Sequence, residues 1–438
     1  MLLGVEASLQ SQHSGSLTFR KNISVSEKKQ TFCLCTIGTR GDILPFTYLA
    51  SELVKKGHIV IALSNTNWRS LFEKVGASFI SIAPKDATQS GRNDFLFFKN
   101  SIVPSFYKTF EEIDKLLHKL PNFTVVFRSG MAGARAAVEK YDLRSVKIML
   151  QPCQMRSVER PPWPLTELSQ SRFSSLHRKT IIPMLYHFGE LRSPYRKWVN
   201  KFREDMDLPV DYLFSGQKFP EKFSIMLCPS WFAMPQKDWE GDVHCLGFPL
   251  ARSNDLLDLK LEKFIGKHGK PIVFTPGTGV SDISKFFTTA EGILKRLNLP
   301  GVFLSQNIDV FTPTISNVIL RQYVSLDRLL PKSLLLIHHG GIGTTAQAIK
   351  AGIPQIICPD RFDQPDNALR VAELGLGVAV FKDGFDSEEW TEIVSKVIKD
   401  EELNGRTKSA ANYINNNAIE EACALIQDLT FLPQKTVS

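Results

Sequence analysis

Long apolar runs are missing from this chain of 438 residues. No stretch approaches the roughly 20 residues that a membrane-spanning helix needs, which argues against a membrane-spanning protein. Cysteine is scarce, with seven residues in total, and their scattered positions lack the spacing of a disulfide framework or a zinc site. An odd number without paired spacing favours free thiols in a reducing compartment. We therefore expect a cytoplasmic protein without a bound metal.

Apolar residues are also sparse in residues 1–30, which are polar and rich in Ser and Gln. This segment lacks the central apolar run of a signal peptide, and its composition predicts a disordered tail outside the fold. The chain as a whole has 43% hydrophobic and 22% charged residues, which is an ordinary globular balance. The length predicts two or three domains.

The net charge of the chain is +8 at pH 7. Surface lysine is the plain explanation, whereas attraction to an anionic ligand or to an anionic membrane surface are functional ones. Nucleic acid is a further explanation that rests on charge alone, because no recognised nucleic-acid motif is present. We therefore expect no nucleic-acid partner.

The most informative segment begins with an apolar run over residues 333–337, which predicts a buried parallel strand. Two histidines, a glycine turn and two threonines follow the strand, and a predicted helix then covers residues 346–351. Glycines let a ligand approach the backbone, and the free N–H groups of a helix start attract an anion such as a diphosphate. A plain turn between strand and helix is the alternative, since glycines alone are weak evidence. The candidate ligand-binding residues here are His338, His339, Gly341, Gly343, Thr344 and Thr345.

A second cluster follows the next predicted strand, residues 355–359. Asp363 and Gln364 lie just beyond the carboxyl end of that strand, with Asn367 a few positions further. Open α/β sheets bind ligands at this edge, so the two loops are expected to share one crevice. Helix capping before Pro365 is the structural alternative for Asp363 and Gln364.

Near the amino terminus, a strand over residues 31–37 runs into a second glycine turn, and a helix is expected to begin near Pro45. Asp42 stands in this turn, at the carboxyl end of the strand. It is suited either to cap the helix or to act as a general base on a substrate hydroxyl. Alternating strands and helices along the rest of the chain predict doubly wound parallel sheets.

These motifs carry a family resemblance. The segment HHGGIGTTAQAIKAGIPQIICPDRFDQPDNALRVAELGLG resembles the donor-binding motif of inverting glycosyltransferases with the two-domain GT-B architecture. The pattern GTRGDxxPF resembles the amino-terminal motif of sterol and antibiotic glycosyltransferases, and rhamnolipid-forming rhamnosyltransferases are also similar. The resemblance implies two Rossmann-like domains facing across a cleft. The implied parts are a tail over 1–30, an acceptor-binding domain over 31–248, a linker over 249–270, a donor-binding domain over 271–415, and a helix over 416–438 that packs back on the first domain.

The resemblance further implies transfer of a hexose from a nucleotide-diphosphate sugar, of the UDP-glucose or dTDP-rhamnose type, to a hydroxyl of a small hydrophobic or lipid-like acceptor. Transfer would invert the anomeric carbon, need no metal or other cofactor, and require the domains to close on both substrates. Asp42 would be the base, and Asp363 and Gln364 would bind sugar hydroxyls. The diphosphate would lie on Gly277, Thr278, His339, Gly341, Gly343, Thr344 and Thr345; the nucleobase on Tyr323, Val324 and Ser325; and further donor-side candidates are Arg40, Gly41, His338 and Asn367.

Two other readings stay open at this point. One is a nucleotide-sugar hydrolase or epimerase on the same fold, and the other is a non-catalytic nucleotide-sugar-binding protein. Joint retention of Asp42, His339, Asp363 and Gln364 counts against the second of these readings. The expected location is cytoplasmic, with contact at the inner face of the membrane left open, and the sequence does not indicate an oligomeric state.

Overall fold

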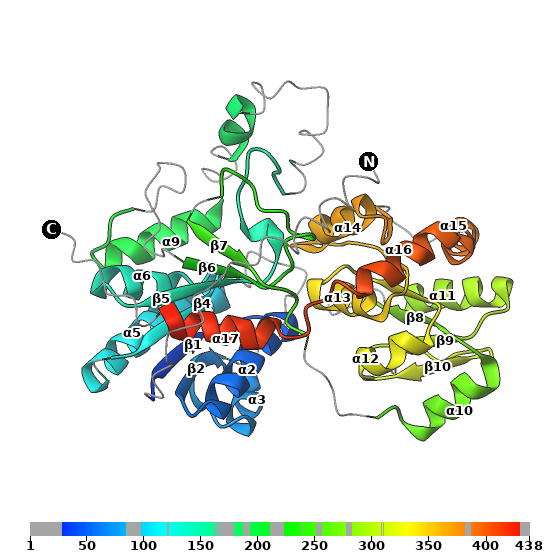
Figure 1. The fold of residues 1–438 in the computed structure, drawn as a ribbon, viewed down its shortest axis with the longest axis horizontal. Coiled ribbons are helices and arrows are strands. Elements are labelled where there is room, and N and C mark those ends of the chain that lie inside the picture. Colours follow the sequence, from blue (N-terminus) through cyan, green and yellow to red (C-terminus); the bar gives the residue numbers. More distant parts are fainter. Residues whose placement is uncertain are drawn as a thin grey trace. The chain divides into compact units, whose positions relative to one another are not determined.

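The structure is a computed structural model. It describes residues 29–84, 98–120, 122–162, 165, 179–186, 193–210, 223–239, 241–250, 256–276, 283–307, 309, 311–381 and 387–429. The chain divides into two compact units, of which the first comprises Met1–Pro249 with Asn417–Ser438 and the second comprises Leu250–Asn416. Each unit has a parallel β-sheet with helices on both faces (Figure 1). The prediction of two doubly wound parallel sheets is confirmed.

The first unit is built on a seven-stranded sheet with the order β3-β2-β1-β4-β5-β6-β7. Successive side chains of a strand face opposite layers: Phe32 and Leu34 pack with α2, α3 and α17, whereas Cys33 and Cys35 pack with α5, α6 and α9. Burial on both faces explains why its strands read as apolar runs. The elements are β1 (Thr31–Cys35), α2 (Arg40–Lys55), β2 (Ile59–Asn65), α3 (Arg69–Lys74), β3 (Ser78–Ala83), α5 (Val103–Lys119), β4 (Thr124–Arg128), α6 (Ala132–Tyr141), β5 (Ser145–Met149), α9 (Pro194–Asp205), β6 (Phe223–Met226), β7 (Asp242–Cys245) and α17 (Ala418–Leu429).

The last helix, α17, belongs to the first unit although the whole second unit precedes it in the sequence. It lies beside α2 (Figure 1). Its residues Ala422, Cys423 and Ile426 are buried in the core that α2 shares. The Sγ of Cys423 lies 3.7 Å from the carbonyl oxygen of Leu49. The chain therefore passes from one unit to the other twice.

The second unit has a six-stranded sheet with the order β10-β9-β8-β11-β12-β13. Helices α11 and α15 cover one face, over Phe274, Phe303 and Ile337, while α10, α12 and α13 cover the other. The elements are α10 (Leu259–His268), β8 (Ile272–Thr275), α11 (Ile283–Leu297), β9 (Gly301–Leu304), β10 (Val318–Arg321), α12 (Leu326–Leu329), β11 (Leu335–His338), α13 (Ile342–Ala351), β12 (Gln355–Ile357), α14 (Gln364–Glu373), β13 (Gly377–Ala379), α15 (Ser387–Lys399) and α16 (Glu401–Ala411).

Helix α2 begins earlier than the sequence indicated. The expected start near Pro45 is wrong, because Thr39 and Asp42 form a capping box that starts the helix at Arg40. Pro45 then lies inside the helix and has no N–H to donate to the carbonyl of Gly41. This shift places Asp42 in the first turn of α2.

Candidate active site

The turn that holds Asp42 and the turn that follows β11 each lie where the strand order of their sheet reverses. This happens between β1 and β4 in the first unit and between β8 and β11 in the second. Open parallel sheets bind ligands beyond the carboxyl ends of the strands at such a point. Asp42 follows β1 and Arg128 ends β4, while the turn from His338 to Gly341 follows β11. Sheet topology alone therefore marks these two positions as candidate sites.

The Asp42 carboxylate is held on both oxygens. Its Oδ2 accepts hydrogen bonds from the Thr39 N–H, at 2.9 Å, and from the Thr39 hydroxyl, at 3.1 Å. Its Oδ1 lies 3.4 Å from Nη1 of Arg128. The capping role that the sequence left open is thus realised. The ion pair with Arg128 is a feature that sequence reasoning missed.

Gly38 closes one side of the Asp42 carboxylate. Its φ is 138°, and a Cβ on this residue would lie 2.3 Å from Oδ2 of Asp42, which only glycine avoids. The Gly38 N–H donates to Oδ1 of Asn65 at 3.0 Å, and Nε1 of Trp68 donates to the Gly38 carbonyl at 3.2 Å. The turn is therefore fixed by the last side chain of β2, Asn65, and by Trp68, which follows that strand. Of the other candidates in this turn, Arg40 and Gly41 are exposed at the start of α2.

His338 is buried and holds the turn after β11. Its Nδ1 accepts a hydrogen bond from the Gly340 N–H at 3.1 Å, so the proton sits on Nε2, which donates to Oε1 of Gln355 at 2.9 Å. Burial, and to a lesser degree the neighbouring His339, lower the pKa of His338 to about 3. His338 is therefore neutral at pH 7, and its role in the structure is to orient the turn.

His339 lies against the start of α13. A Cβ on Gly341 would meet Nε2 of His339 at 2.7 Å, so the imidazole covers the N-cap position of the helix. Burial lowers the pKa of His339 to about 4, against the opposing influence of the Thr275 carbonyl and the charge of Asp360. At pH 7 the ring is neutral and carries one N–H. A neutral imidazole beside a helix amino terminus suits hydrogen bonding to an anion.

The start of α13 leaves three backbone amides outside the hydrogen bonds of the helix. The first bond of α13 runs from the Thr345 N–H to the Gly341 carbonyl at 3.0 Å, so the amides of residues 342–344 precede it and lie at the open helix end. Gly343 is exposed and Thr344 is half-buried. The side chain of Thr345 is fully buried, and its hydroxyl has no hydrogen-bond partner among the described residues. One helical step of about 100° separates the two threonines, so their side chains point in different directions, and a ligand contact of both hydroxyls stays a prediction.

The loop between β12 and α14 is held to this turn by Asn367. The Asn367 amide donates to the Gly340 carbonyl at 2.9 Å and to Oδ2 of Asp363 at 2.8 Å. Oε1 of Gln364 accepts from the N–H groups of Asp360 and Arg361, at 2.9 and 3.2 Å. These bonds hold the loop and do not cap α14, because the side chain of Asp363, its N-cap residue, makes no capping hydrogen bond. Asn367, a donor-side candidate, is buried and joins the two loops.

Phe362 is a further residue of this loop that sequence reasoning missed. Its φ is 58°, a conformation that is rare for a bulky side chain. The ring is 60% exposed, and the Arg361 guanidinium lies 5.5 Å from its centroid. The strained backbone immediately precedes Asp363 and Gln364.

The remaining predicted residues are more dispersed. Tyr323 follows β10 and is exposed, Val324 is half-buried, and Ser325 is the buried N-cap residue of α12. The Ser325 hydroxyl bonds to the side chain of Asp327. Gly277 and Thr278 lie outside the described residues.

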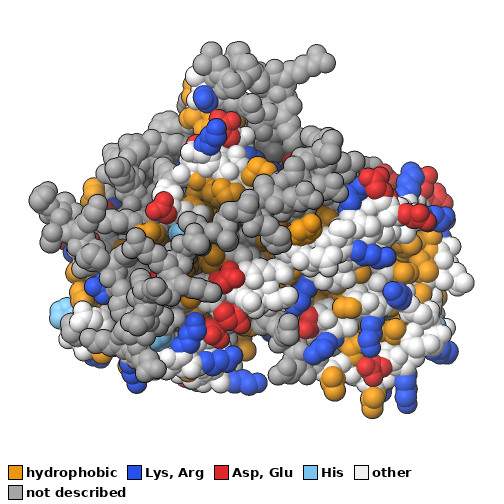
Figure 2. Space-filling view, viewed as in Figure 1, with side chains coloured by type: hydrophobic (Ala, Val, Ile, Leu, Met, Phe, Trp, Pro, Cys, Tyr) orange, Lys and Arg blue, Asp and Glu red, His pale blue; other side chains and the backbone are white. Residues whose placement is uncertain are grey.

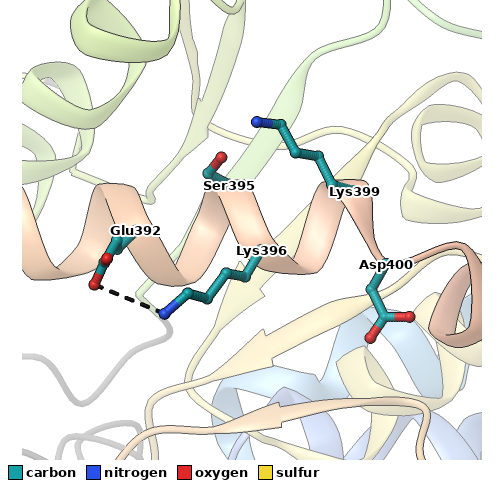
Figure 3. Close-up of a pocket in the computed structure, with 5 residues that line it drawn as sticks. All are labelled: Glu392, Ser395, Lys396, Lys399 and Asp400. Carbon is teal, nitrogen blue, oxygen red and sulfur yellow. Dashed lines mark ion pairs between the residues drawn. The ribbon is translucent and has the colours of Figure 1, made fainter.

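A surface hollow of about 400 Å³ lies along α15 and is lined by Glu392, Ser395, Lys396, Lys399 and Asp400. Figure 3 shows Ser395 and Lys399 on one side of the helix and the ion-paired Glu392 and Lys396 on the other. None of the predicted site residues lines this hollow. Basic and acidic side chains are interspersed over the coloured part of the face in Figure 2. Within the described ranges, no three His, Cys, Asp or Glu side chains form a group that could hold a metal ion, and no helix there is long and apolar enough to cross a membrane.

Two family models match this chain. The glycosyltransferase family 28 N-terminal domain matches residues 32–149, and the C-terminal domain of erythromycin biosynthesis protein CIII-like proteins matches residues 306–426. The chain is 35% identical over 416 residues to the NDP-glycosyltransferase YjiC of Bacillus subtilis, which covers 91% of this chain and 97% of that protein. It is 24% identical to an O-mycaminosyltylonolide 6-deoxyallosyltransferase of Streptomyces fradiae, over 90% of this chain and 96% of that protein.

A sterol 3-beta-glucosyltransferase of Pichia angusta is 25% identical over 81% of this chain, which spans 30% of that longer protein. Among solved structures, the glycotransferase of kitacinnamycin has a TM-score of 0.71 at 16% identity, and the alignment covers 93% of this chain and 100% of that one. The spinosyn rhamnosyltransferase SpnG, complexed with thymidine diphosphate, has a TM-score of 0.63 at 15% identity and is covered to 99%, with 91% of this chain aligned. At these identities the structural matches establish a shared fold.

Proposed function

This chain belongs to the GT-B glycosyltransferases of the UDP-glycosyltransferase type, and we propose that it moves a hexose from a nucleotide-diphosphate sugar to a hydroxyl of a small hydrophobic acceptor. The observation that carries the proposal is the placement of His339 over the N-cap of α13. An imidazole N–H and a helix start together form a site for a diphosphate. The relatives that are named as transferases acting on O-mycaminosyltylonolide and on sterols support a hydrophobic acceptor.

In the proposed reaction, the acceptor oxygen attacks the anomeric carbon of the sugar and its proton passes to the Asp42 carboxylate. The bond between the anomeric carbon and the diphosphate oxygen breaks, so the configuration inverts and the nucleotide diphosphate leaves. The His339 N–H and the amides of residues 342–344 stabilise the charge that grows on the leaving group. Asp363 and Gln364 would bind sugar hydroxyls. This arrangement needs no metal ion.

The donor half of the proposal is tested by a thermal-shift titration with UDP, dTDP, GDP and their common sugar conjugates. A ligand present at a hundred times its Kd stabilises a protein by about 2.7 kcal/mol, which gives a measurable rise in Tm. We expect a rise with UDP or dTDP, the latter because a structural neighbour is complexed with thymidine diphosphate. A folded protein that responds to none of these ligands would overturn the donor site.

The acceptor half is tested by the substitution Asp42→Asn. Asparagine keeps an oxygen that can accept from Thr39 but removes the basic carboxylate, so sugar transfer should fall by about 10²–10⁴-fold. The nucleotide-induced rise in Tm should stay unchanged. Transfer at the wild-type rate would remove Asp42 from the role of base.

A further inference from the structure

Thr39 and Gly38 close off one oxygen of the Asp42 carboxylate and leave the other oxygen, Oδ1, open. A carboxylate offers about four lone-pair positions, two on each oxygen. Both positions on Oδ2 are used by the N–H and hydroxyl of Thr39, and Gly38 stands against the same oxygen. Oδ1 faces a single described cation, Arg128, at 3.4 Å. The position left for a substrate proton is therefore on Oδ1, beside the guanidinium.

Arg128 is carried by an interior strand of the sheet. It is the last residue of β4, which pairs with β1 on one side and with β5 on the other. Its side chain is 19% exposed and that of Asp42 is 18% exposed, so the ion pair is shielded from much of the solvent.

The Nε of Arg128 is buried and has no hydrogen-bond partner among the described residues. An unsatisfied buried donor lowers stability, so stability alone does not explain an arginine here.

We propose that Arg128 is a positioning residue for Asp42. The guanidinium fixes the rotation of the carboxylate, so that Oδ1 presents its free lone pair to the acceptor hydroxyl while Oδ2 stays bound to Thr39. An acceptor hydroxyl that donates to Oδ1 would lie near the same positive charge, which would favour the negative charge that develops on its oxygen. This inference rests on the proposed function of Asp42 as the base.

The test compares Arg128→Met, Arg128→Lys and the wild type in steady-state transfer, with a donor and an acceptor on which the wild type is active. Displacement of a reacting group by about 1 Å can cost roughly 100-fold in rate. Arg128→Met should therefore lower kcat by about 10- to 100-fold, with the donor KM and the nucleotide-induced rise in Tm unchanged. Arg128→Lys keeps the charge but not the planar fork, and should recover part of kcat.

Arg69→Met is the matched control, because Arg69 also pairs with a carboxylate of the first unit, Glu73, at 3.1 Å. This control should leave kcat unchanged. If Arg128→Met has a kcat within twofold of the wild type, or if it lowers kcat and nucleotide binding together, the positioning role is overturned.

Failure of the proposed function is recognised separately, since the wild type would then transfer no sugar to any acceptor tested. The interaction between Asp42 and Arg128 is in that case measured by a double-mutant cycle of Asp42→Asn and Arg128→Met in urea unfolding. A coupling free energy that differs from zero supports the pairing that the inference requires. A coupling of zero overturns it.

Discussion

At the scale of single residues, Phe362 shows local strain beside the donor motif. Four non-glycine residues with positive φ occur among the described residues, and the other three are Asp142, Asp207 and Asn298. Short polar side chains tolerate this conformation, whereas phenylalanine does not. The loop keeps Phe362 in place because Gln364 binds the amides of Asp360 and Arg361.

The substitution Phe362→Gly should therefore raise the free energy of unfolding. Relief of the left-handed conformation is worth about 1–2 kcal/mol, and the extra freedom of glycine in the unfolded chain removes about 0.5–1 kcal/mol. The expected net gain is roughly 0.5–1 kcal/mol in urea denaturation. Phe362→Ala is the control, because it removes the exposed ring and keeps a Cβ at the same φ. An equal gain from Phe362→Ala would contradict the strain.

The buried histidines predict how stability depends on pH. The pKa values of His338 and His339 in the folded chain are about 3 and 4, below the ordinary value near 6.5. The unfolded chain therefore binds more protons than the folded chain below pH 6.5. Stability should be highest above about pH 6.5 and should fall towards pH 4, by up to roughly 1.4 kcal/mol per pH unit for each histidine.

Urea denaturation between pH 7.5 and pH 5 measures this slope. In His338→Gln one of the two titrating groups is absent, so the slope should become shallower than that of the wild type, whatever the substitution does to the stability at pH 7.5. Identical slopes for the two proteins would show that His338 does not carry the effect.

At the scale of elements, the strand–turn–helix units could be predicted from the sequence. The residue at which each helix begins, and therefore the direction of its side chains, could not. The alternation of apolar runs with glycine turns placed Asp42 and His339 at strand ends, because these signals are local in the sequence. The partner of Asp42 was hidden, since Arg128 reaches it only through the pairing of β1 with β4. The inward direction of Thr345 depends on where α13 begins, and helix starts are set by caps that sequence patterns locate to within a few residues.

Two glycines near the start of α13 differ in whether they leave space for a Cβ: Gly340 in the turn after β11 and Gly343 in the first turn of the helix. A Cβ on Gly340 would lie 2.7 Å from Cγ2 of Ile357 and 3.1 Å from the carbonyl oxygen of Gln364, at a φ of 93°. Gly340→Ala should therefore destabilise the second unit by about 1–3 kcal/mol. A Cβ on Gly343 would have no other atom within 4 Å beyond its chain neighbours and the backbone of its own helix. Gly343→Ala should be stabilising by about 0.5–1 kcal/mol, since alanine favours the helix. Equal melting temperatures for the two variants would contradict this geometry.

At the scale of the whole molecule, α17 completes the core of the first unit. Ile426 is fully buried there, while Ala424 on the same helix is exposed. Ile426→Asp would bury an unpaired carboxylate in an apolar cluster and should destabilise the first unit by about 3–5 kcal/mol. Ala424→Asp introduces the same side chain on the exposed face and should change stability by less than about 0.5 kcal/mol. Calorimetry of both variants measures this difference in stability. Similar melting curves for the two variants would contradict the burial of Ile426 against α2.

Because α17 follows the second unit in the sequence, it also determines when the first unit can finish folding. The ribosome synthesises Met1–Pro249 first and then all of Leu250–Asn416 before α17 emerges. At 5–20 residues per second, that interval lasts on the order of ten to thirty seconds. The face of α2 that carries Leu49 stays without its covering helix throughout this time. The first half of the enzyme to be translated is therefore the last to be completed.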